Sequence, residues 1–333
     1  MRIGSLRSRP GRVVRGSLKV DGVEIPVAIL EGSRPGPSIY LQAAQHPTEM
    51  MGVEVTHRVL TELDPAKLRG TIVVVPIANP VHAAWTAGLE KHSTLVPPRR
   101  KKKLRAINTN RVWPGKRNGN LIEQITYALY ENICRQVDAI VDFHCCRICD
   151  HYFAAALDGH AASVELAKSF GAPLVDVQDE RSYAEGLLFL VAPPLIDTPS
   201  ILIEMSPDGD ITYDMLANGV RGVHNMLKHL GMLPGRPQLP KTQVVVRRAD
   251  PVRVFRARKE GYLTTYRQVG EPVSKGALLC EVRGLDRFEV LQTVRAPYDG
   301  APPSIGPNSG LRIVKPGEEI CTFKRVAQII RNR

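Results

Sequence analysis

The stretch Thr71-Ile-Val-Val-Val-Pro-Ile77 is the clearest β-strand in this sequence of 333 residues, because it contains an unbroken run of β-branched residues up to Val75. Similar short runs at 38–44, 138–144 and 200–205 alternate with segments that have helical spacing. Strands separated by helices indicate an α/β fold with a doubly wound, mostly parallel sheet and helices on both faces. In such folds, ligands bind beyond the carboxyl ends of the strands.

The spacing of apolar residues predicts helices over 50–63, 120–137 and 215–230. The second helix begins with a capping-box pattern, in which Asn120 is followed three residues later by Glu123. Apolar runs at 152–157 and 187–192 are predicted to be two further strands of the sheet.

The chain length suggests about two domains. After the helix that ends near residue 230, the Pro- and Gly-rich stretch 234–240 resembles a linker, and short strands punctuated by turns follow it. We therefore expect a catalytic domain at 1–236 and a C-terminal all-β domain, sandwich- or barrel-like, at 241–333. This domain has turn phrases of biotinyl and lipoyl carriers but no Lys in a Met-flanked hairpin, so a structural cap is the better interpretation.

The sequence carries 45 Lys and Arg against 33 Asp and Glu, a formal net charge of +12. Such a charge suits nucleic acid, an anionic membrane or an anionic small substrate. Aromatic residues are only 5% of the chain, and its two basic clusters, at 99–105 and 247–259, lack a nucleic-acid-binding signature. We expect solvated surface or local guidance of an anionic ligand, with no nucleic acid and no membrane as partner. The absence of long apolar runs and of a signal-peptide pattern favours a cytoplasmic location.

Polar residues occur where apolar strand sequence ends. His46 follows the strand at 38–44 with Glu49 three positions later, His144 closes the strand at 138–144, and Glu204 lies in the apolar strand at 200–205. Each residue alone is commonly structural, but four of them at one edge of a parallel sheet favour a site. Two His and one carboxylate are a ligand set for catalytic Zn²⁺, and a further carboxylate can act as general base.

These residues resemble a known family. His46-x-x-Glu49, Asn110-Arg111-Val-Trp-Pro-Gly115, Val141-Asp-Phe-His144 and Ile203-Glu204 have the order and rough spacing of the succinylglutamate desuccinylase/aspartoacylase family. That family consists of zinc amidohydrolases on the carboxypeptidase fold. The resemblance covers nearly the whole chain after about residue 20, the β domain included, and the ordered set is more specific than any single motif.

The resemblance implies that His46, Glu49 and His144 hold one Zn²⁺ per chain and that Glu204 is the catalytic carboxylate. It also implies that Arg111, with Asn110 beside it, binds a substrate carboxylate, for which a planar guanidinium is well matched. Asp142 is then expected to support a metal ligand or to be structural.

The sequence departs from the family pattern in three places. The first motif reads His46-Pro47-Thr48-Glu49 instead of His-Gly-Asn-Glu, which keeps the ligand spacing but restricts the backbone. The arginine that polarises the substrate carbonyl does not align uniquely; Arg105 is the first choice and Lys103 the alternative. Asn108-Thr109 stands where an acidic residue is common.

The cysteines suggest a rival site. Cys145, Cys146 and Cys149 follow His144 directly, and Cys-x-x-Cys beside histidines can bind metal. No second Cys-x-x-Cys is present, so reduced thiols beside the pocket are the simpler interpretation. A structural zinc site and a pocket or redox role remain alternatives.

The sequence therefore predicts a zinc-dependent hydrolase that cleaves the amide of a small anionic N-acylated amino acid or related amine. The first alternative is a zinc carboxypeptidase that trims a peptide or peptide-like metabolite, because the ligand set is shared. The second is a non-catalytic binding protein on the same fold, which would not need Glu204. The resemblance is also compatible with a homo-oligomer.

Overall fold

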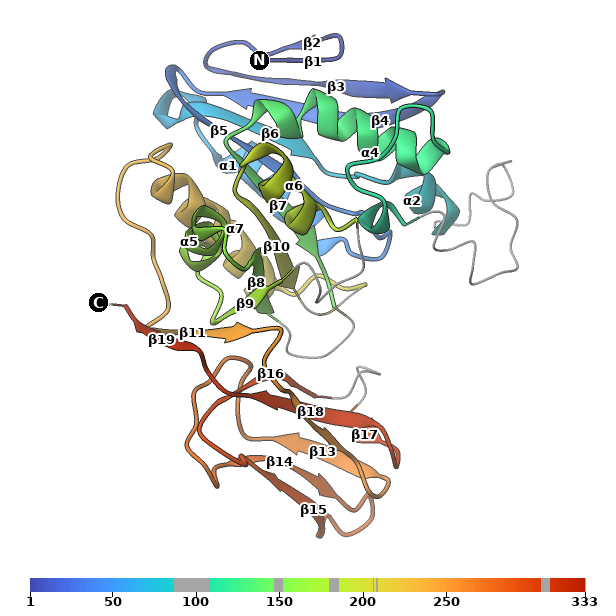
Figure 1. Ribbon diagram of the computed structural model, residues 1–333, viewed down its shortest axis with the longest axis vertical. Helices are drawn as coiled ribbons and strands as arrows, with labels where there is room; N and C mark the ends of the chain where they lie inside the picture. The colour runs from blue at the N-terminus through green and yellow to red at the C-terminus, as the bar shows by residue number, and fades with distance from the viewer. Residues whose placement is uncertain are drawn as a thin grey trace.

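The protein is described by a computed structural model that covers residues 1–86, 108–146, 152–179, 186–205, 207, 209–306 and 312–332. Figure 1 shows a large twisted sheet flanked by helices, with smaller sheets of the C-terminal part of the chain on one side of it. A two-stranded hairpin of β1 (Arg2–Ile3) and β2 (Leu6–Arg7) precedes the large sheet.

The large sheet has ten strands within the described residues, in the spatial order β19-β11-β9-β8-β10-β7-β5-β6-β4-β3. In chain order these are β3 (Arg12–Val20), β4 (Val23–Glu31), β5 (Arg34–Gln42), β6 (Arg69–Val75), β7 (Ala139–His144), β8 (Tyr152–Leu157), β9 (Leu174–Gln178), β10 (Ser200–Met205), β11 (Thr242–Arg247) and β19 (Gln328–Arg331).

The strand pairs inside this sheet are mostly parallel. Strands β6, β5, β7 and β10 run parallel to one another, as do β8, β9 and β11, whereas β3, β4 and β19 pair antiparallel at the two edges and β8 pairs antiparallel with β10. The predicted α/β fold with a mostly parallel sheet is confirmed. The carboxyl ends of β5, β7 and β10 therefore meet at one edge, where the site lies.

Helices cover both faces of the sheet. They are α1 (Met51–Glu62), α2 (Pro80–Thr86), α4 (Leu121–Asn132), α5 (Ala161–Phe170), α6 (Leu188–Ile196) and α7 (Tyr213–His229), with the 3-10 turns η1 (Pro65–Lys67), η3 (Thr109–Arg111) and η4 (Cys134–Gln136). Successive side chains of β5 point to opposite faces of the sheet and so enter two different cores. Ile39 and Leu41 pack toward α1, α5 and α7, and Tyr40 packs toward α4 and α6.

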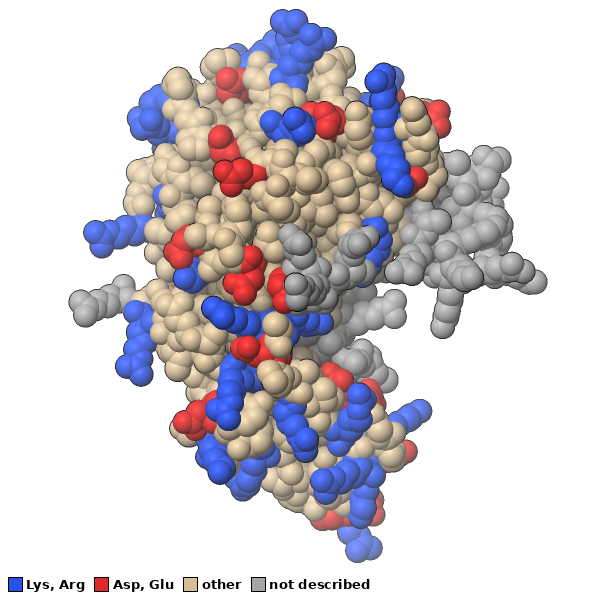
Figure 2. Space-filling model, in the orientation of Figure 1, with Lys and Arg blue, Asp and Glu red and all other residues tan. Residues whose placement is uncertain are grey.

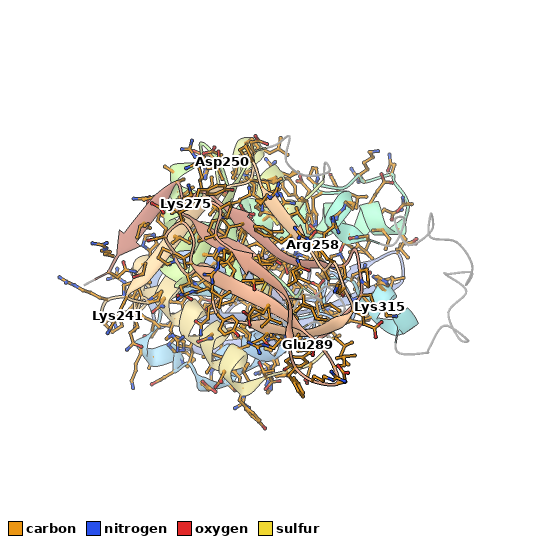
Figure 3. The ribbon with its side chains drawn as sticks, turned by 90° about the horizontal axis from the view of Figure 1, so that it is seen from below. Lys241, Asp250, Arg258, Lys275, Glu289 and Lys315 are labelled. Carbon is orange, nitrogen blue, oxygen red and sulfur yellow. The ribbon has the colours of Figure 1, made fainter. Side chains whose placement is uncertain are left out.

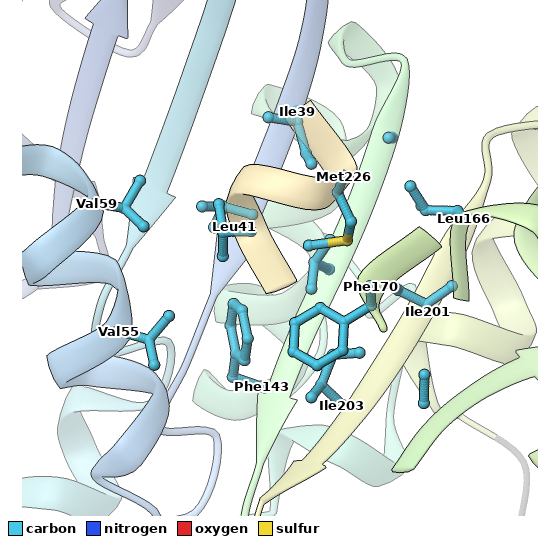
Figure 4. Close-up of a cluster of buried hydrophobic side chains, with 14 of the residues drawn as sticks. Ile39, Leu41, Val55, Val59, Phe143, Leu166, Phe170, Ile201, Ile203 and Met226 are labelled. Carbon is cyan, nitrogen blue, oxygen red and sulfur yellow. The ribbon is translucent and has the colours of Figure 1, made fainter. Parts of the chain in front are cut away.

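Figure 4 shows the first of these cores, in which Phe143 of β7 lies beside Phe170 of α5. Their ring centroids are 6.4 Å apart, a tilted aromatic contact. Burial of a side chain such as Phe143 contributes about 1.5–3 kcal/mol. Because His144 follows Phe143 directly, this packing fixes the end of the strand that carries it.

Two sequence predictions need correction. Residues 187–192 were expected to form a strand, but they begin the helix α6. The run is apolar throughout and buried on several sides, so its periodicity does not distinguish a strand from a buried helix. The helix expected at 120–137 starts with the predicted Asn120–Glu123 capping box but ends at Asn132, and η4 follows.

The C-terminal part forms two smaller antiparallel sheets. One contains β12 (Arg253–Arg256), β16 (Ala301–Ile305) and β18 (Glu319–Lys324), and the other contains β13 (Gly261–Thr265), β14 (Leu278–Arg283), β15 (Val290–Arg295) and β17 (Ile313–Val314). Figure 3 views these strands from below, with Arg258, Lys275 and Lys315 on the side that faces the viewer. Strands β11 and β19 instead extend the large sheet, so the C-terminal segment is joined to it at both ends.

Basic side chains are widely distributed. On the face drawn in Figure 2, Lys and Arg lie over the large sheet and over the C-terminal sheets, with Asp and Glu among them. Among the described residues, no helix combines the length and apolar character that a membrane span requires.

Candidate metal centre

The loop between β5 and α1 brings His46 and Glu49 together. The backbone N–H of Glu49 donates to the carbonyl oxygen of His46 at 3.3 Å, which closes a turn around Pro47 and Thr48. His46 Nδ1 then lies 2.7 Å from Glu49 Oε1. The His46-x-x-Glu49 spacing thus places both side chains at the carboxyl end of β5.

His144, the last residue of β7, completes the cluster. Its Nδ1 lies 2.8 Å from Glu49 Oε2, so the carboxylate of Glu49 bridges the two imidazoles. One donor atom from each of His46, Glu49 and His144 lies within 4.8 Å of the other two. Glu49 and His144 are buried and His46 is half-buried. The structure therefore brings together the three residues that the sequence predicted as metal ligands.

The opposite nitrogen of each imidazole is held by an oxygen. His144 Nε2 lies 3.0 Å from Asp142 Oδ2, and His46 Nε2 lies 3.1 Å from Asn108 Oδ1. With a proton on Nε2 of each ring, both contacts are hydrogen bonds and both Nδ1 atoms are directed toward Glu49. Two imidazole nitrogens and one carboxylate, held in this way, are a donor set that fits Zn²⁺ with a further position open.

Asp142 is itself enclosed by side-chain amides. Its Oδ1 accepts a hydrogen bond from Gln42 Nε2 at 3.0 Å, and its Oδ2 accepts one from Gln45 Nε2 at 2.5 Å. Gln45 is held in turn by Trp113, whose Nε1 donates to Gln45 Oε1 at 2.8 Å. This buried network fixes the carboxylate that orients His144.

Sequence reasoning named Asp142 but missed the amides around it and missed Asn108. The available signal was position: Gln45 directly precedes His46, and Asn108 lies two residues before Asn110. The departure at Asn108 now has a physical reason, because its Oδ1 contacts His46 and also accepts from the backbone N–H of Asn110 at 2.9 Å.

The protonation of the cluster follows from its contacts. Burial by itself would raise the pKa of Glu49, but the neighbouring His144 and His46 lower that pKa to about 2. Burial by itself would lower the pKa of His144, but Asp142 and Glu49 raise it well above its usual value. The pocket thus stabilises positive charge beside Glu49, which is what a divalent cation would supply.

We expect Asp142→Asn to lower zinc affinity by about 10–100-fold, because the amide is a weaker acceptor for His144 Nε2–H and does not balance its charge. Competition with a chelator would measure the change. The exposed Asp158→Asn is the matched control and should bind zinc as the wild type does. Equal affinity of the Asp142 variant and the wild type would contradict a role in holding His144.

Glu204 lies on the strand next to His144. The parallel pairing of β10 with β7 places Glu204 opposite His144, so both side chains project from the same face of the sheet. Glu204 also lines a cavity of about 450 Å³, together with Cys146, which follows His144 by two residues. Glu204 therefore lies beside the three candidate metal ligands and borders the cavity.

The predicted substrate-binding residues lie in η3. Asn110 is buried, with its amide nitrogen 3.4 Å from His144 Nε2. Arg111 is half-buried, and its Nη1 donates to the backbone carbonyl of Asn110. Arg105 and the alternative Lys103 lie outside the described residues.

Across the described part of the chain, His46, Glu49 and His144 form the one group of three or more residues with metal-ligand geometry. Cys145 is buried and Cys146 borders the cavity. Cys149, which completes the Cys-x-x-Cys pattern, lies outside the described residues.

The model of the succinylglutamate desuccinylase/aspartoacylase catalytic domain matches residues 35–230, more than half of the chain. This protein belongs to the succinylglutamate desuccinylase/aspartoacylase family. The desuccinylase/aspartoacylase match includes His46, Glu49, His144 and Glu204, and it ends after α7, before the C-terminal sheets.

Similar proteins extend over most of the chain. N-alpha-acetyl-L-2,4-diaminobutyric acid deacetylase of Halomonas elongata is 27% identical over 294 residues, which are 84% of this chain and 80% of the relative. The product-bound ectoine utilization protein EutE (DoeB) of Ruegeria pomeroyi has a TM-score of 0.68 at 24% identity and covers 96% of this chain and 98% of its own. A succinylglutamate desuccinylase of a Silicibacter species has a TM-score of 0.68 at 22% identity, with coverage of 98% and 100%. The two structures show that the fold extends through the C-terminal sheets.

Proposed function

We propose that this protein is a zinc-dependent amidohydrolase that removes the acyl group from a small N-acylated amino acid or a related amine. The observation that carries the proposal is the convergence of His46, Glu49 and His144 within 4.8 Å, beside Glu204 at the edge of a cavity. Family membership supports it, and so does a relative whose name is that of a deacetylase acting on an N-acetylated diamino acid.

His46, Glu49 and His144 would hold the ion, and Zn²⁺ bound there would supply a Lewis acid for the amide carbonyl and lower the pKa of water. The other roles belong to side chains of this chain. Glu204 takes a proton from the attacking water and delivers it to the amine nitrogen as the C–N bond breaks. Asp142 and Asn108 keep both imidazoles oriented while charge shifts in the site.

We further propose that residues 1–236 form the catalytic domain and that residues 241–333 form a cap over the substrate. The cavity beside Glu204 supports this division, because Val254, Ser304 and Thr322 of the C-terminal sheet line it opposite the large sheet. The cap would then shape the space in which the acyl amine lies.

Arg111→Ala is expected to raise the KM for carboxylate-bearing substrates by about 10–100-fold, the loss of one or two charge-assisted hydrogen bonds, with a smaller change in kcat. Steady-state kinetics would measure the effect with two substrates: an N-acyl amino acid, and the same compound with a carboxamide in place of its α-carboxylate. The exposed Arg117→Ala, in the same loop region, is the control. A KM that rises equally for both substrates would remove Arg111 from carboxylate binding.

Metal analysis combined with a mass-spectrometric screen of N-acyl amino acids and short peptides tests the function. About one equivalent of zinc per chain and release of an acyl group would support the proposal. Release of a C-terminal residue would instead support the carboxypeptidase alternative, for which the shared ligand set is the specific argument. A zinc-loaded protein that binds these compounds without turnover would support the non-catalytic alternative.

A further inference from the structure

The cavity beside Glu204 extends across the large sheet. Its floor includes Phe153 of β8 and Leu174 and Asp176 of β9, and its roof comes from residues of β12, β16 and β18. Asp176 is the feature that the catalytic proposal does not use. It lies on the same face of the sheet as Glu204, since both line this one cavity.

Asp176 is a buried carboxylate with few partners. The residue is 7% exposed, and its Oδ2 accepts a hydrogen bond from Gln178 Nε2 at 2.7 Å. Within the described ranges it has no ion-pair partner within 4.0 Å and no other side-chain hydrogen bond. A buried carboxylate is costly unless a cation or further donors compensate it, so this position suits a cationic ligand.

Two basic residues border the same cavity, and neither pairs with Asp176. Lys324 directs its Nζ to backbone carbonyl oxygens, 2.6 Å from that of Arg247 and 2.9 Å from that of Arg248. Burial raises the pKa of Asp176, while its bond with Gln178 and the more distant charges of Arg248 and Lys324 oppose that rise. Glu319, a carboxylate in the roof of this cavity, differs because its Oε2 lies 3.6 Å from Arg256 Nη2.

The strand register gives the separation between Asp176 and Glu204. Phe153 of β8 lies opposite Glu204 on one side and opposite Leu174 on the other, and Asp176 is two residues beyond Leu174. The path from Glu204 to Asp176 crosses two strand spacings of about 4.8 Å each and runs two residues of about 3.3 Å each along the strand. The Cα atoms of Glu204 and Asp176 are therefore about 12 Å apart.

That separation corresponds to a small substrate. Five bonds join the amide carbon of an Nα-acylated diamino acid to an ammonium on its γ carbon, which is about 6 Å when extended. Polar contacts of about 3 Å at each end of the substrate account for the remaining part of the separation of about 12 Å between the two residues. The carbonyl would then lie at Glu204 while the ammonium reaches Asp176.

We propose that Asp176 is the subsite for a free ammonium group of the substrate, so that the preferred substrates are N-acylated diamino acids with the second amine unmodified. This inference rests on the proposed deacylase function and assigns its specificity. Asp176 acts at the end of the substrate away from the reacting bond, whereas Arg111 is assigned to the carboxylate.

The test compares Nα-acetyl-2,4-diaminobutyrate with Nα-acetylnorvaline, which has a methyl group in place of the ammonium. In the zinc-loaded wild type, we expect a higher kcat/KM for the diamino substrate. Asp176→Asn should lower that kcat/KM by about 30-fold or more, the usual effect of removing one partner of a buried charge pair, and change the norvaline value by less than about threefold. Equal losses on both substrates, or no wild-type preference, would overturn the inference and leave the deacylase function standing.

A matched variant and a binding measurement complete the test. Glu319→Gln removes a carboxylate from the same cavity and should change both substrates by the same factor; a selective loss there would assign the ammonium to Glu319 instead. Calorimetry with free 2,4-diaminobutyrate and norvaline measures the affinity of the subsite for the ammonium group without any need for turnover. Preferential binding of the diamine that is lost in Asp176→Asn would support the subsite even if neither acetyl substrate were cleaved, and equal binding of the two amino acids would refute it.

Discussion

Glu204→Gln is expected to retain about one equivalent of zinc and to lose turnover by about 10²–10⁴-fold, the contribution of a positioned general base. The amide has nearly the shape of the carboxylate but accepts no proton at neutral pH. Since the proposed metal ligands are His46, Glu49 and His144, which form a cluster without Glu204, zinc content should not change. Metal analysis and kcat on the same preparation separate the two effects.

The exposed Glu165→Gln on α5 is a suitable control, because it makes the same chemical change at a solvent-exposed helix position, where the carboxylate pairs only with Lys168 of the same helix among the described residues. Its kcat should equal that of the wild type. A Glu204→Gln variant with normal kcat would exclude Glu204 as the base, and one that loses zinc would assign it to the metal instead.

His144→Ala is expected to abolish zinc binding at micromolar metal and activity with it. One of three protein donors is lost, so the affinity should fall beyond the 10–100-fold expected for an orienting partner such as Asp142. The change also leaves Glu49 and Asp142 as buried carboxylates without the imidazole that links them. Chelator competition measures the affinity, and thermal unfolding with and without zinc measures the stability.

His57→Ala is the matched control, because His57 is exposed on α1. It should bind zinc and melt as the wild type does. Full zinc content in His144→Ala would show that the ion binds elsewhere, and the cysteines after His144 would then be the first candidates to examine.

Much of the fold is local in origin and was predictable. The β-branched run at 71–75 lies within β6, and the Asn120–Glu123 capping box starts α4 where it was expected. Both signals depend on residues within a few positions of one another, which is why they survive without knowledge of the fold. The strand predicted at 187–192 was wrong for the opposite reason. A run that is apolar throughout takes its conformation from the elements that surround it, and here it joins the helical layer over β7, β8 and β10.

The clustering of His46, Glu49 and His144 was predictable for a related reason. His46 and Glu49 follow β5 and His144 ends the parallel strand β7, and the carboxyl ends of such strands meet at one edge of the sheet whatever their exact register. The partners of the cluster were not predictable, because Asn108 and Trp113 reach it from an irregular segment whose path no periodic pattern describes.

The sequence by itself determined the α/β class, the capped helix and the residues that can bind a metal, because each depends on short-range patterns or on the order of strands and helices. Only the tertiary structure decided which oxygens orient the imidazoles, and that β11 and β19 tie the C-terminal segment into the large sheet. It also decided that Asp176 shares a cavity with Glu204. Those features depend on strand register and on packing between segments far apart in the chain, where a shift of one residue turns a side chain to the other face.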